Sequence, residues 1–308
     1  MSMRYQAAIM KPGFNPLGTQ TSNTYYNLYT WGQNSYGQLG LGNVTAYSSP
    51  KQVGTTEWLT AAAGQYYTVA IKVGGTLWSW GKNDSGQLGI GNTTYYSSPK
   101  QIGALTTWAS VYAASVYCFA IKTDGTLWAW GNNGSGQLGV NDLSNRSSPT
   151  QVGTATWKSV GALGNSFALG VRTTGELYAW GLNTQGQLGL GTTTTYSAPV
   201  RVGALTNWSQ VSPQFQSAVA VKTDGTLWSW GYNGYGNLGT GNVNTYYSPK
   251  QIGALTTWSK VAAGNGHSLA IKTDGTLWAW GNGNQGQLGN NTLNQYSSPV
   301  QIGALTNW

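Results

Sequence analysis

Charged residues are scarce in this chain. Only 7% of its 308 residues are Asp, Glu, Lys or Arg, whereas an average soluble domain has about 25%. The seven acidic residues include no pair at a spacing that suggests general acid–base catalysis. There is one histidine, His267, and one cysteine, Cys118, so the sequence holds no Cys/His cluster for zinc and no internal disulfide. These shortages predict a protein that is not an enzyme and that binds no metal or cofactor.

The single histidine and the single cysteine both have a structural interpretation. We expect His267 to be a hydrogen-bonded structural residue, because no acid or nucleophile stands near it at a motif spacing. Cys118 lies in an apolar run, residues 117–120. That position predicts a buried and unreactive thiol.

Long apolar runs are missing as well. The first residues lack the basic segment and the apolar stretch of a signal peptide. No segment is apolar over the 18 or so residues that a membrane-spanning helix needs. We therefore expect no membrane association, and a protein that is made in a cytoplasm whatever its destination.

What the chain has in abundance is a repeat. The pair Trp-Gly recurs at intervals of 49 or 50 residues and runs on into Gly-Gln-Leu-Gly or a close variant. The six copies are Trp31-Gly32, Trp80-Gly81, Trp130-Gly131, Trp180-Gly181, Trp230-Gly231 and Trp280-Gly281. A fixed period of this length indicates one supersecondary unit copied along the chain.

The repeated unit has the pattern of short strands and turns. In the last copy, residues 268–272 alternate apolar and polar side chains, as a half-buried strand does. Residues 273–276 contain Asp-Gly, which predicts a primed hairpin turn with positive φ angles, and residues 277–281 form the return strand. Pro299 predicts the start of an outer strand, where no ladder N–H is lost. About four strands per unit, without a helical period, are typical of a β-propeller blade.

The sequence therefore predicts an all-β chain that forms a single β-propeller, with six blades of about four antiparallel strands rather than seven blades. Residues 28–308 would form the propeller and residues 1–27 an N-terminal arm. Because residues 5–10 are a plausible strand, we expect the arm either to close the ring by sharing a blade or to dock on another chain. We expect most of the 16 tryptophans to pack between blades.

The repeated phrase resembles that of a known family. It is similar to the regulator of chromosome condensation repeat. The motifs that carry the resemblance are Asp-Gly-Thr-Leu-Trp-Ala-Trp-Gly, then Gly-Gln-Leu-Gly, then Pro, and then a Val-x-Ala-Gly strand that His267 follows. The resemblance covers nearly all of residues 28–308 and implies a β-propeller, seven-bladed in the best-known members. This chain departs from it by having six anchors and a single family histidine.

Two sets of residues recur at the repeat spacing and are candidate binding sites. The first would form a ring of loop side chains: Tyr47, Tyr96, Arg146, Tyr196, Tyr246 and Tyr296. The second would form a basic ring: Lys72, Lys122, Arg172, Lys222 and Lys272. Tyrosine gives large contact area at low entropy cost, but each ring could equally pack on its own blade. The basic set could bind an anion or nucleic acid, yet we favour solvated strand ends, because nucleic-acid patches are denser.

Three functions follow as hypotheses. The neutral polar surface and the absence of catalytic groups favour a structural virion component of a phage, capsid-decorating or tail-associated and adhesive, whose partners are capsid or tail proteins. A carbohydrate-binding lectin that stacks glycans on its aromatic residues is an alternative. The family resemblance also implies a guanine-nucleotide exchange factor or another intracellular protein-binding propeller. We expect a location in the virion, or otherwise in the cytoplasm.

Overall fold

The computed structural model describes residues 6–10, 26–161 and 166–308. These residues form strands, turns and loops without a helix, which confirms the all-β prediction. They divide into two compact units, each described by itself. Unit 1 comprises Met1–Asn133 with Ser144–Ala155, and unit 2 comprises Gly134–Leu143 with Thr156–Trp308.

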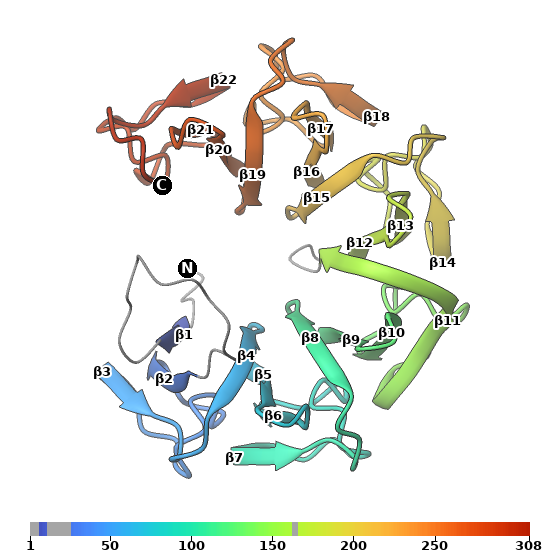
Figure 1. The fold of residues 1–308 in the computed structure, drawn as a ribbon, viewed down its shortest axis with the longest axis vertical. Coiled ribbons are helices and arrows are strands. Elements are labelled where there is room, and N and C mark those ends of the chain that lie inside the picture. Colours follow the sequence, from blue (N-terminus) through green and yellow to red (C-terminus); the bar gives the residue numbers. More distant parts are fainter. Residues whose placement is uncertain (1–5, 11–25, 162–165) are drawn as a thin grey trace. The chain divides into compact units, whose positions relative to one another are not determined.

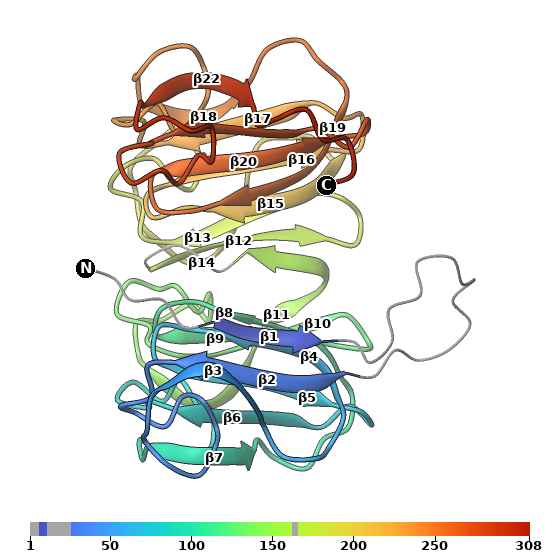
Figure 2. The same cartoon turned by 90° about the vertical axis from the view of Figure 1, so that its left-hand side faces the viewer.

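Unit 1 contains three antiparallel sheets whose strands follow one another in chain order (Figure 1). The first sheet is β1 (Gln6–Met10), β2 (Asn27–Gly32) and β3 (Tyr47–Gln52). The second is β4 (Trp58–Ala63), β5 (Tyr67–Lys72), β6 (Leu77–Gly81) and β7 (Tyr96–Gln101). The third is β8 (Trp108–Ala113), β9 (Tyr117–Lys122), β10 (Thr126–Gly131) and the first part of β11 (Arg146–Gly161). The strands of β1–β3 and β4–β7 can be followed in Figure 2.

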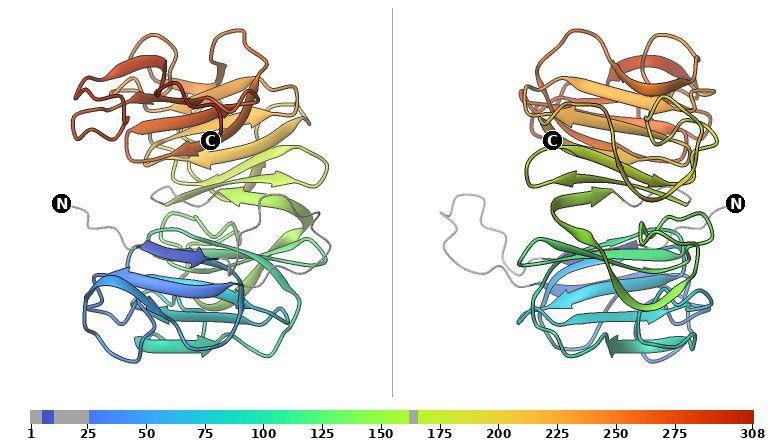
Figure 3. Two further views of the ribbon diagram at one scale, coloured as in Figure 1. Left: turned by 60° about the vertical axis from the view of Figure 1, so that its left-hand side comes forward. Right: turned by 90° about the vertical axis from the view of Figure 1, so that its right-hand side faces the viewer.

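Unit 2 repeats the same arrangement three times, in yellow-green to red in Figure 3. Its first sheet is the second part of β11 with β12 (Phe167–Arg172), β13 (Leu177–Gly181) and β14 (Tyr196–Arg201). The next is β15 (Trp208–Pro213), β16 (Ser217–Lys222), β17 (Leu227–Gly231) and β18 (Tyr246–Gln251). The last is β19 (Trp258–Ala263), β20 (His267–Lys272), β21 (Leu277–Gly281) and β22 (Tyr296–Gln301).

The outer strands begin earlier than the sequence predicts. β22 starts at Tyr296, which pairs with Gly281, and not at Pro299. Proline is tolerated inside this strand because β22 is the edge of its sheet and Pro299 has no register partner in β21.

The hairpin turn between β20 and β21 is also of another type than expected. Gly275 has φ 80°, but Asp274 is not among the described non-glycine residues with positive φ, so the turn is not a primed one. The N–H of Gly275 donates to the carbonyl of Lys272 and the N–H of Lys272 to that of Thr276, the pattern of a hairpin with a left-handed glycine after a tight turn. The Asp274 carboxylate accepts from the N–H and the hydroxyl of Thr276, at 2.9 and 2.6 Å.

In at least four of the six repeats, the loop after the Trp-Gly pair is organised by the same hydrogen bonds of a buried asparagine. The Asn83 side chain is fully buried. Its amide donates to the carbonyls of Asn92 and Thr94, at 2.9 and 3.0 Å, and its oxygen accepts from the N–H of Leu88. The same contacts recur at Asn34, Asn183 and Asn233. One side chain therefore satisfies three backbone groups of the loop, which explains the Asn in the repeat.

Neighbouring sheets are joined by the tryptophan of the Trp-Gly pair. The indole N–H of Trp130 donates to the carbonyl of Gln87, 2.9 Å away in the preceding repeat. The same bond links Trp80 to Gln38, Trp180 to Gln137, Trp230 to Gln187 and Trp280 to Asn237. These five indoles are fully buried, so the prediction that tryptophans pack between blades is confirmed for them.

The N-terminal arm contributes one strand. Its residues 6–10 form β1, which pairs with β2 from Gln6↔Trp31 to Met10↔Asn27, the register that β5 has with β6. The strand expected at residues 5–10 is therefore present over the described part. Residue 5 and the segment 11–25 lie outside the described residues, and ring closure by the arm stays a prediction. In the described parts of the chain, no helix has the length and apolarity that crossing a membrane requires.

Candidate functional site

The basic residues that recur at the repeat spacing are stacked on aromatic rings. The ammonium nitrogen of Lys272 lies 3.8 Å from the ring centre of Trp278 and 5.0 Å from that of Trp258. Equivalent pairs of contacts hold Lys72, Lys122, Arg172 and Lys222. Burial lowers the pKa of Lys72 and Lys222. These cations thus extend the aromatic packing, and anion binding by the set remains a prediction.

The tyrosines of the candidate ring begin the outer strands and are half-buried. Tyr96, Tyr196 and Tyr296 pack against the apolar cores of their own units. The hydroxyls of Tyr47 and Tyr246 accept from the amides of Asn43 and Asn242. Arg146 donates to the carbonyl of Ser144. Each side chain therefore has contacts within its own repeat, and a shared binding role stays a prediction.

The histidine and the cysteine lie in different repeats, on the equivalent strands β20 and β9. His267 begins β20 and is half-buried. Cys118 is fully buried, and its thiol donates to the hydroxyl of Tyr67 at 3.3 Å. Burial raises the pKa of the Cys118 thiol well above its ordinary value, which keeps it protonated and unreactive. Within residues 6–10, 26–161 and 166–308, no group of three or more His, Cys, Asp or Glu side chains could hold a metal ion.

One cluster of unit 1 breaks the repeat, and sequence analysis missed it. It consists of Tyr36, Tyr66 and Tyr95 with Lys82 and Asp84, and we call it the tyrosine cluster. Where it has Tyr36, Tyr66 and Tyr95, the next repeat has Ser85, Val116 and Asn145. Its members come from three separate loops, so no local sequence pattern could show that they meet.

The tyrosine cluster is tightly connected. The Tyr36 ring lies 5.1 Å from Tyr66 and 5.7 Å from Tyr95, both edge-on. The ammonium of Lys82 lies 5.0 Å from the Tyr36 ring centre and 2.8 Å from the Asp84 carboxylate. The hydroxyl of Tyr95 donates to the same carboxylate. The hydrogen bond to Asp84 raises the pKa of Lys82, which favours the ammonium form of Lys82.

The cluster is open to solvent. Tyr95 is 42% exposed and the Asp84 side chain 48% exposed, while Tyr36 and Tyr66 are half-buried. In unit 2 the repeat position of Tyr36 is also a tyrosine, Tyr235, and its ring lies edge-on to Tyr232 at 6.2 Å. That pair comes from a single loop, and the repeat positions of Tyr66 and Tyr95 hold Gly266 and Gln295. The full cluster therefore occurs at one place in the described residues of unit 1.

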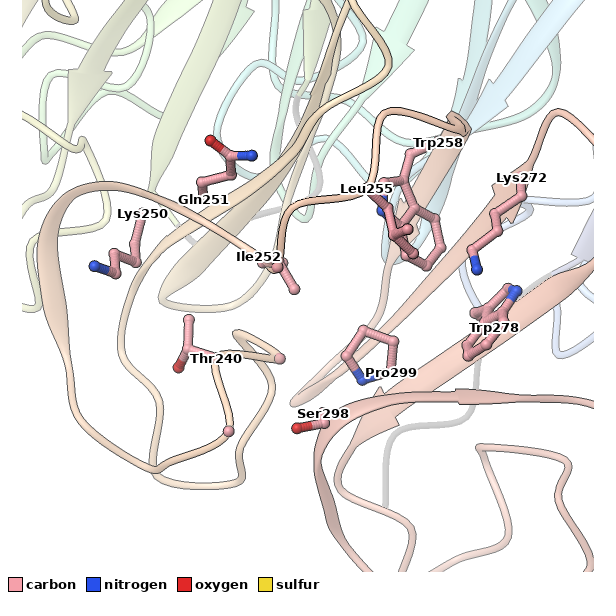
Figure 4. A pocket seen from close by; sticks show the side chains of 13 residues that line it. Thr240, Lys250, Gln251, Ile252, Leu255, Trp258, Lys272, Trp278, Ser298 and Pro299 are labelled. Atoms are coloured by element: carbon pink, nitrogen blue, oxygen red, sulfur yellow. The ribbon is translucent and has the colours of Figure 1, made fainter.

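Each unit also has a cleft between neighbouring sheets, which we call the junction cleft. In unit 2 it has a volume of about 380 Å³, with Ile252, Leu255, Trp258, Trp278 and Pro299 among its walls (Figure 4). In unit 1 it has a volume of about 340 Å³. Its walls there include the equivalent residues Ile102, Leu105, Trp108, Trp128 and Pro149.

Comparisons with known proteins agree with this architecture. The regulator of chromosome condensation (RCC1) repeat matches residues 27–71, 74–121, 124–169, 174–212, 224–271 and 274–308. A second description of that repeat matches residues 60–87, 157–187 and 258–287. The comparison with curated proteins gives no significant match.

Solved structures show the same fold. The crystal structure of human WBSCR16 is 22% identical with a TM-score of 0.81, over 91% of this chain and 77% of that one. Prp20p from Saccharomyces cerevisiae is 20% identical with a TM-score of 0.79, over 91% and 75%. Yeast RCC1 (Prp20) bound to Kap60 is 19% identical with a TM-score of 0.78, over 91% and 73%. The chain therefore belongs to the regulator of chromosome condensation (RCC1) repeat family and has its β-propeller fold, with about six blades.

Proposed function

We propose that this protein is a non-enzymatic interaction module that binds a partner protein through the tyrosine cluster. The observation that carries the proposal is the cluster's departure from the repeat. Positions that follow the repeat serve packing, as the tryptophans and asparagines do. Three tyrosines gathered at one exposed place by three loops have no equivalent in the next repeat.

The chemistry of the cluster suits a protein surface. Tyrosine side chains combine a large apolar ring with a polar tip and lose little entropy on binding. Ser35 and Gln65, next to Tyr36 and Tyr66, are exposed and neutral. Because Lys82 and Asp84 neutralise each other, we expect recognition by aromatic contact and hydrogen bonding at this place and not by charge.

The hydrogen bonds of three aspartate side chains support a non-enzymatic role. The carboxylates of Asp124, Asp224 and Asp274 are bonded to the threonine two residues on. Hydrogen bonds to these threonines lower the pKa of the three carboxyls, which makes them poor proton acceptors near neutral pH.

Proteins with the same fold are described with protein partners. The structure of Prp20p is reported with its binding properties to Gsp1p and histones, and another was solved with Kap60. This chain carries a net charge of +8, which repels a basic protein and attracts an acidic one. We therefore propose an acidic or neutral partner.

Site-specific cross-linking tests the proposal. A photo-reactive residue at Ser35 or Gln65, both exposed, should cross-link one protein in extract of the source cells, identified by mass spectrometry. Tyr36→Ala combined with Tyr95→Ala should remove that product. Tyr235→Ala, at the Tyr36 position of another repeat, is the matched control and should leave it unchanged. The proposal would be contradicted if Tyr235→Ala removed the cross-linked product and the double substitution of Tyr36 and Tyr95 did not.

The virion and carbohydrate-binding predictions gain no support from the comparisons and stay predictions, whereas the family match is consistent with an exchange-factor propeller. Acceleration of nucleotide release from a panel of small GTPases would favour the exchange factor over a passive module. A glycan array tests the carbohydrate-binding prediction. Mass spectrometry of purified particles tests the virion location, because a capsid or tail component must be present at fixed stoichiometry.

A further inference from the structure

The junction cleft is built by the repeat itself. Its walls in unit 1 and unit 2 are formed by residues at equivalent repeat positions, for example Leu105 and Leu255. In both units a backbone bond of 2.7 Å joins the loop to the next outer strand beside the cleft, from Gly91 to Ser147 and from Gly241 to Ser297. Two copies that share their apolar walls and the closing bond indicate a reproducible surface. Lys250 and Lys272 are additional lining residues of the unit 2 cleft.

Apolar side chains line the cleft and remain exposed. Leu255 is 50% exposed and Leu105 is 49% exposed. Figure 4 shows Leu255 in front of Trp258, with Ile252 to one side and Pro299 and Trp278 opposite. Covering such surface releases about 25 cal/mol for each Å², so a ligand with an apolar side chain gains affinity here.

The backbone beside the cleft is uncovered. A Cβ added to Gly253 would meet no atom within 4 Å, and one added to Gly241 would meet only the Ser298 hydroxyl, at 3.7 Å. The cleft is bordered by residues 250 and 251 of β18, which is the edge strand of its sheet. An extended peptide can lie along such an edge and use its main chain for hydrogen bonds.

The charged side chains at the cleft of unit 2 are basic. Lys250 and Lys272 belong to its lining, which contains no carboxylate. The Lys250 ammonium points outward at the rim, and the Lys272 ammonium points toward Trp278 (Figure 4). The buried indole N–H of Trp258 has no hydrogen-bond partner, and the same is true of Trp108 in the other cleft. The side chains that line the cleft therefore carry positive charge and no negative charge.

We propose that the junction cleft is a docking site for an extended acidic peptide of a partner protein, with an apolar side chain such as leucine next to a carboxylate. The apolar side chain packs between Leu255 and Pro299, and a neighbouring carboxylate lies toward the Lys272 ammonium or toward that of Lys250 at the rim. Charge complementarity with a chain of net charge +8 selects the acidic peptide over neutral or basic ones. The site shares no residue with the tyrosine cluster, so the two proposals fail independently.

The experiment titrates the full, ¹⁵N-labelled chain with acetyl-Gly-Glu-Leu-Asp-Gly-amide and follows the indole N–H resonances by NMR. We expect saturable shifts at Trp258 and Trp278, and at the equivalent Trp108 and Trp128, with a dissociation constant on the order of a millimolar or tighter. A peptide with Lys in place of both acids should bind at least tenfold more weakly.

The unit 1 cleft is the internal control for variants in unit 2. Leu255→Asp, in the exposed connection between β18 and β19, should abolish the shifts at Trp258 and Trp278 and leave those at Trp108 and Trp128. Lys272→Met keeps an apolar stem over Trp278 and should weaken binding in unit 2 at least fivefold. Equal binding of the basic peptide, shifts at Trp258 that survive Leu255→Asp, or no saturable shift at all would each overturn the proposal.

Discussion

Two sets of buried tryptophans in this protein differ in one hydrogen bond. Trp130 and its equivalents donate to a carbonyl of the preceding repeat. Trp108 and its equivalents are buried as deeply, but their indole N–H has no partner. The indoles without a partner are those of Trp58, Trp108, Trp157, Trp208 and Trp258. The first set joins the sheets by a directed bond, whereas the second contributes packing and a platform for the stacked cations.

This difference predicts unequal effects of the same substitution. Trp130→Phe removes the donor to the Gln87 carbonyl and leaves a buried acceptor without its main partner, which costs about 1–3 kcal/mol. Trp108→Phe removes ring volume but no hydrogen bond. Urea unfolding of the two variants should therefore show the larger loss of stability for Trp130→Phe. Equal losses would mean that the bond adds nothing to packing.

At the level of structural elements, glycines with positive φ in two different loops of the repeat have different surroundings: Gly89 lies in the loop after a Trp-Gly pair, and Gly103 lies between β7 and β8. Gly89 has φ +69° and its added Cβ would lie 2.8 Å from the Trp130 indole nitrogen. Gly103 has φ +60° and its added Cβ would meet nothing within 4 Å. The backbone strain of a substitution is similar at the two positions. Of the two, only a side chain at Gly89 would also collide with a residue of the next sheet, Trp130.

We expect Gly89→Ala to destabilise unit 1 more than Gly103→Ala. Both variants carry the left-handed strain of about 1–2 kcal/mol. Gly89→Ala also pushes against a fully buried indole, and overpacking of this kind adds about 1–3 kcal/mol. Thermal unfolding of both variants measures the difference. A Gly103→Ala variant that is the less stable of the two would show that the contact with Trp130 relaxes freely.

The aspartate turns make the stability of the fold depend on pH. Hydrogen bonds to the following threonine lower the pKa of Asp124, Asp224 and Asp274 in the folded chain. A carboxyl whose pKa is lower when folded stabilises the fold above its unfolded pKa, near 3.9, and loses that contribution as the pH falls through its folded pKa. The urea concentration at the unfolding midpoint should therefore decrease when the pH is lowered below about 4. Replacing all three aspartates by Asn should reduce this loss of stability at low pH. An unchanged loss would mean that other ionisable groups cause it.

Over the whole molecule, charge is low in amount but one-sided. The chain has 15 basic and seven acidic residues, a net charge of +8. Several of the cations that the repeat would place in a basic ring are stacked on aromatic rings instead. The positive electrostatic potential of the chain attracts acidic molecules, and added salt shortens the range of this attraction.

Binding of the acidic peptide should consequently weaken with salt. Between about 0.05 and 0.5 M NaCl the screening length falls below half, and we expect the dissociation constant to rise several-fold. Calorimetry at the two salt concentrations measures this change. An affinity that is independent of salt would assign binding to apolar contact alone.

The sequence by itself determined the repeat, the strand order of each unit and the burial of tryptophans such as Trp130, because these depend on local periodicity and on neighbours one repeat away. It also placed the arm strand that became β1. It assigned the wrong turn type at Asp274 and began β22 too late, because φ angles and edge pairing are set by the whole hairpin. Only the tertiary structure brought together the tyrosine cluster and the junction clefts. Their residues lie on separate loops and strands, and they meet because packed sheets fix where those loops end.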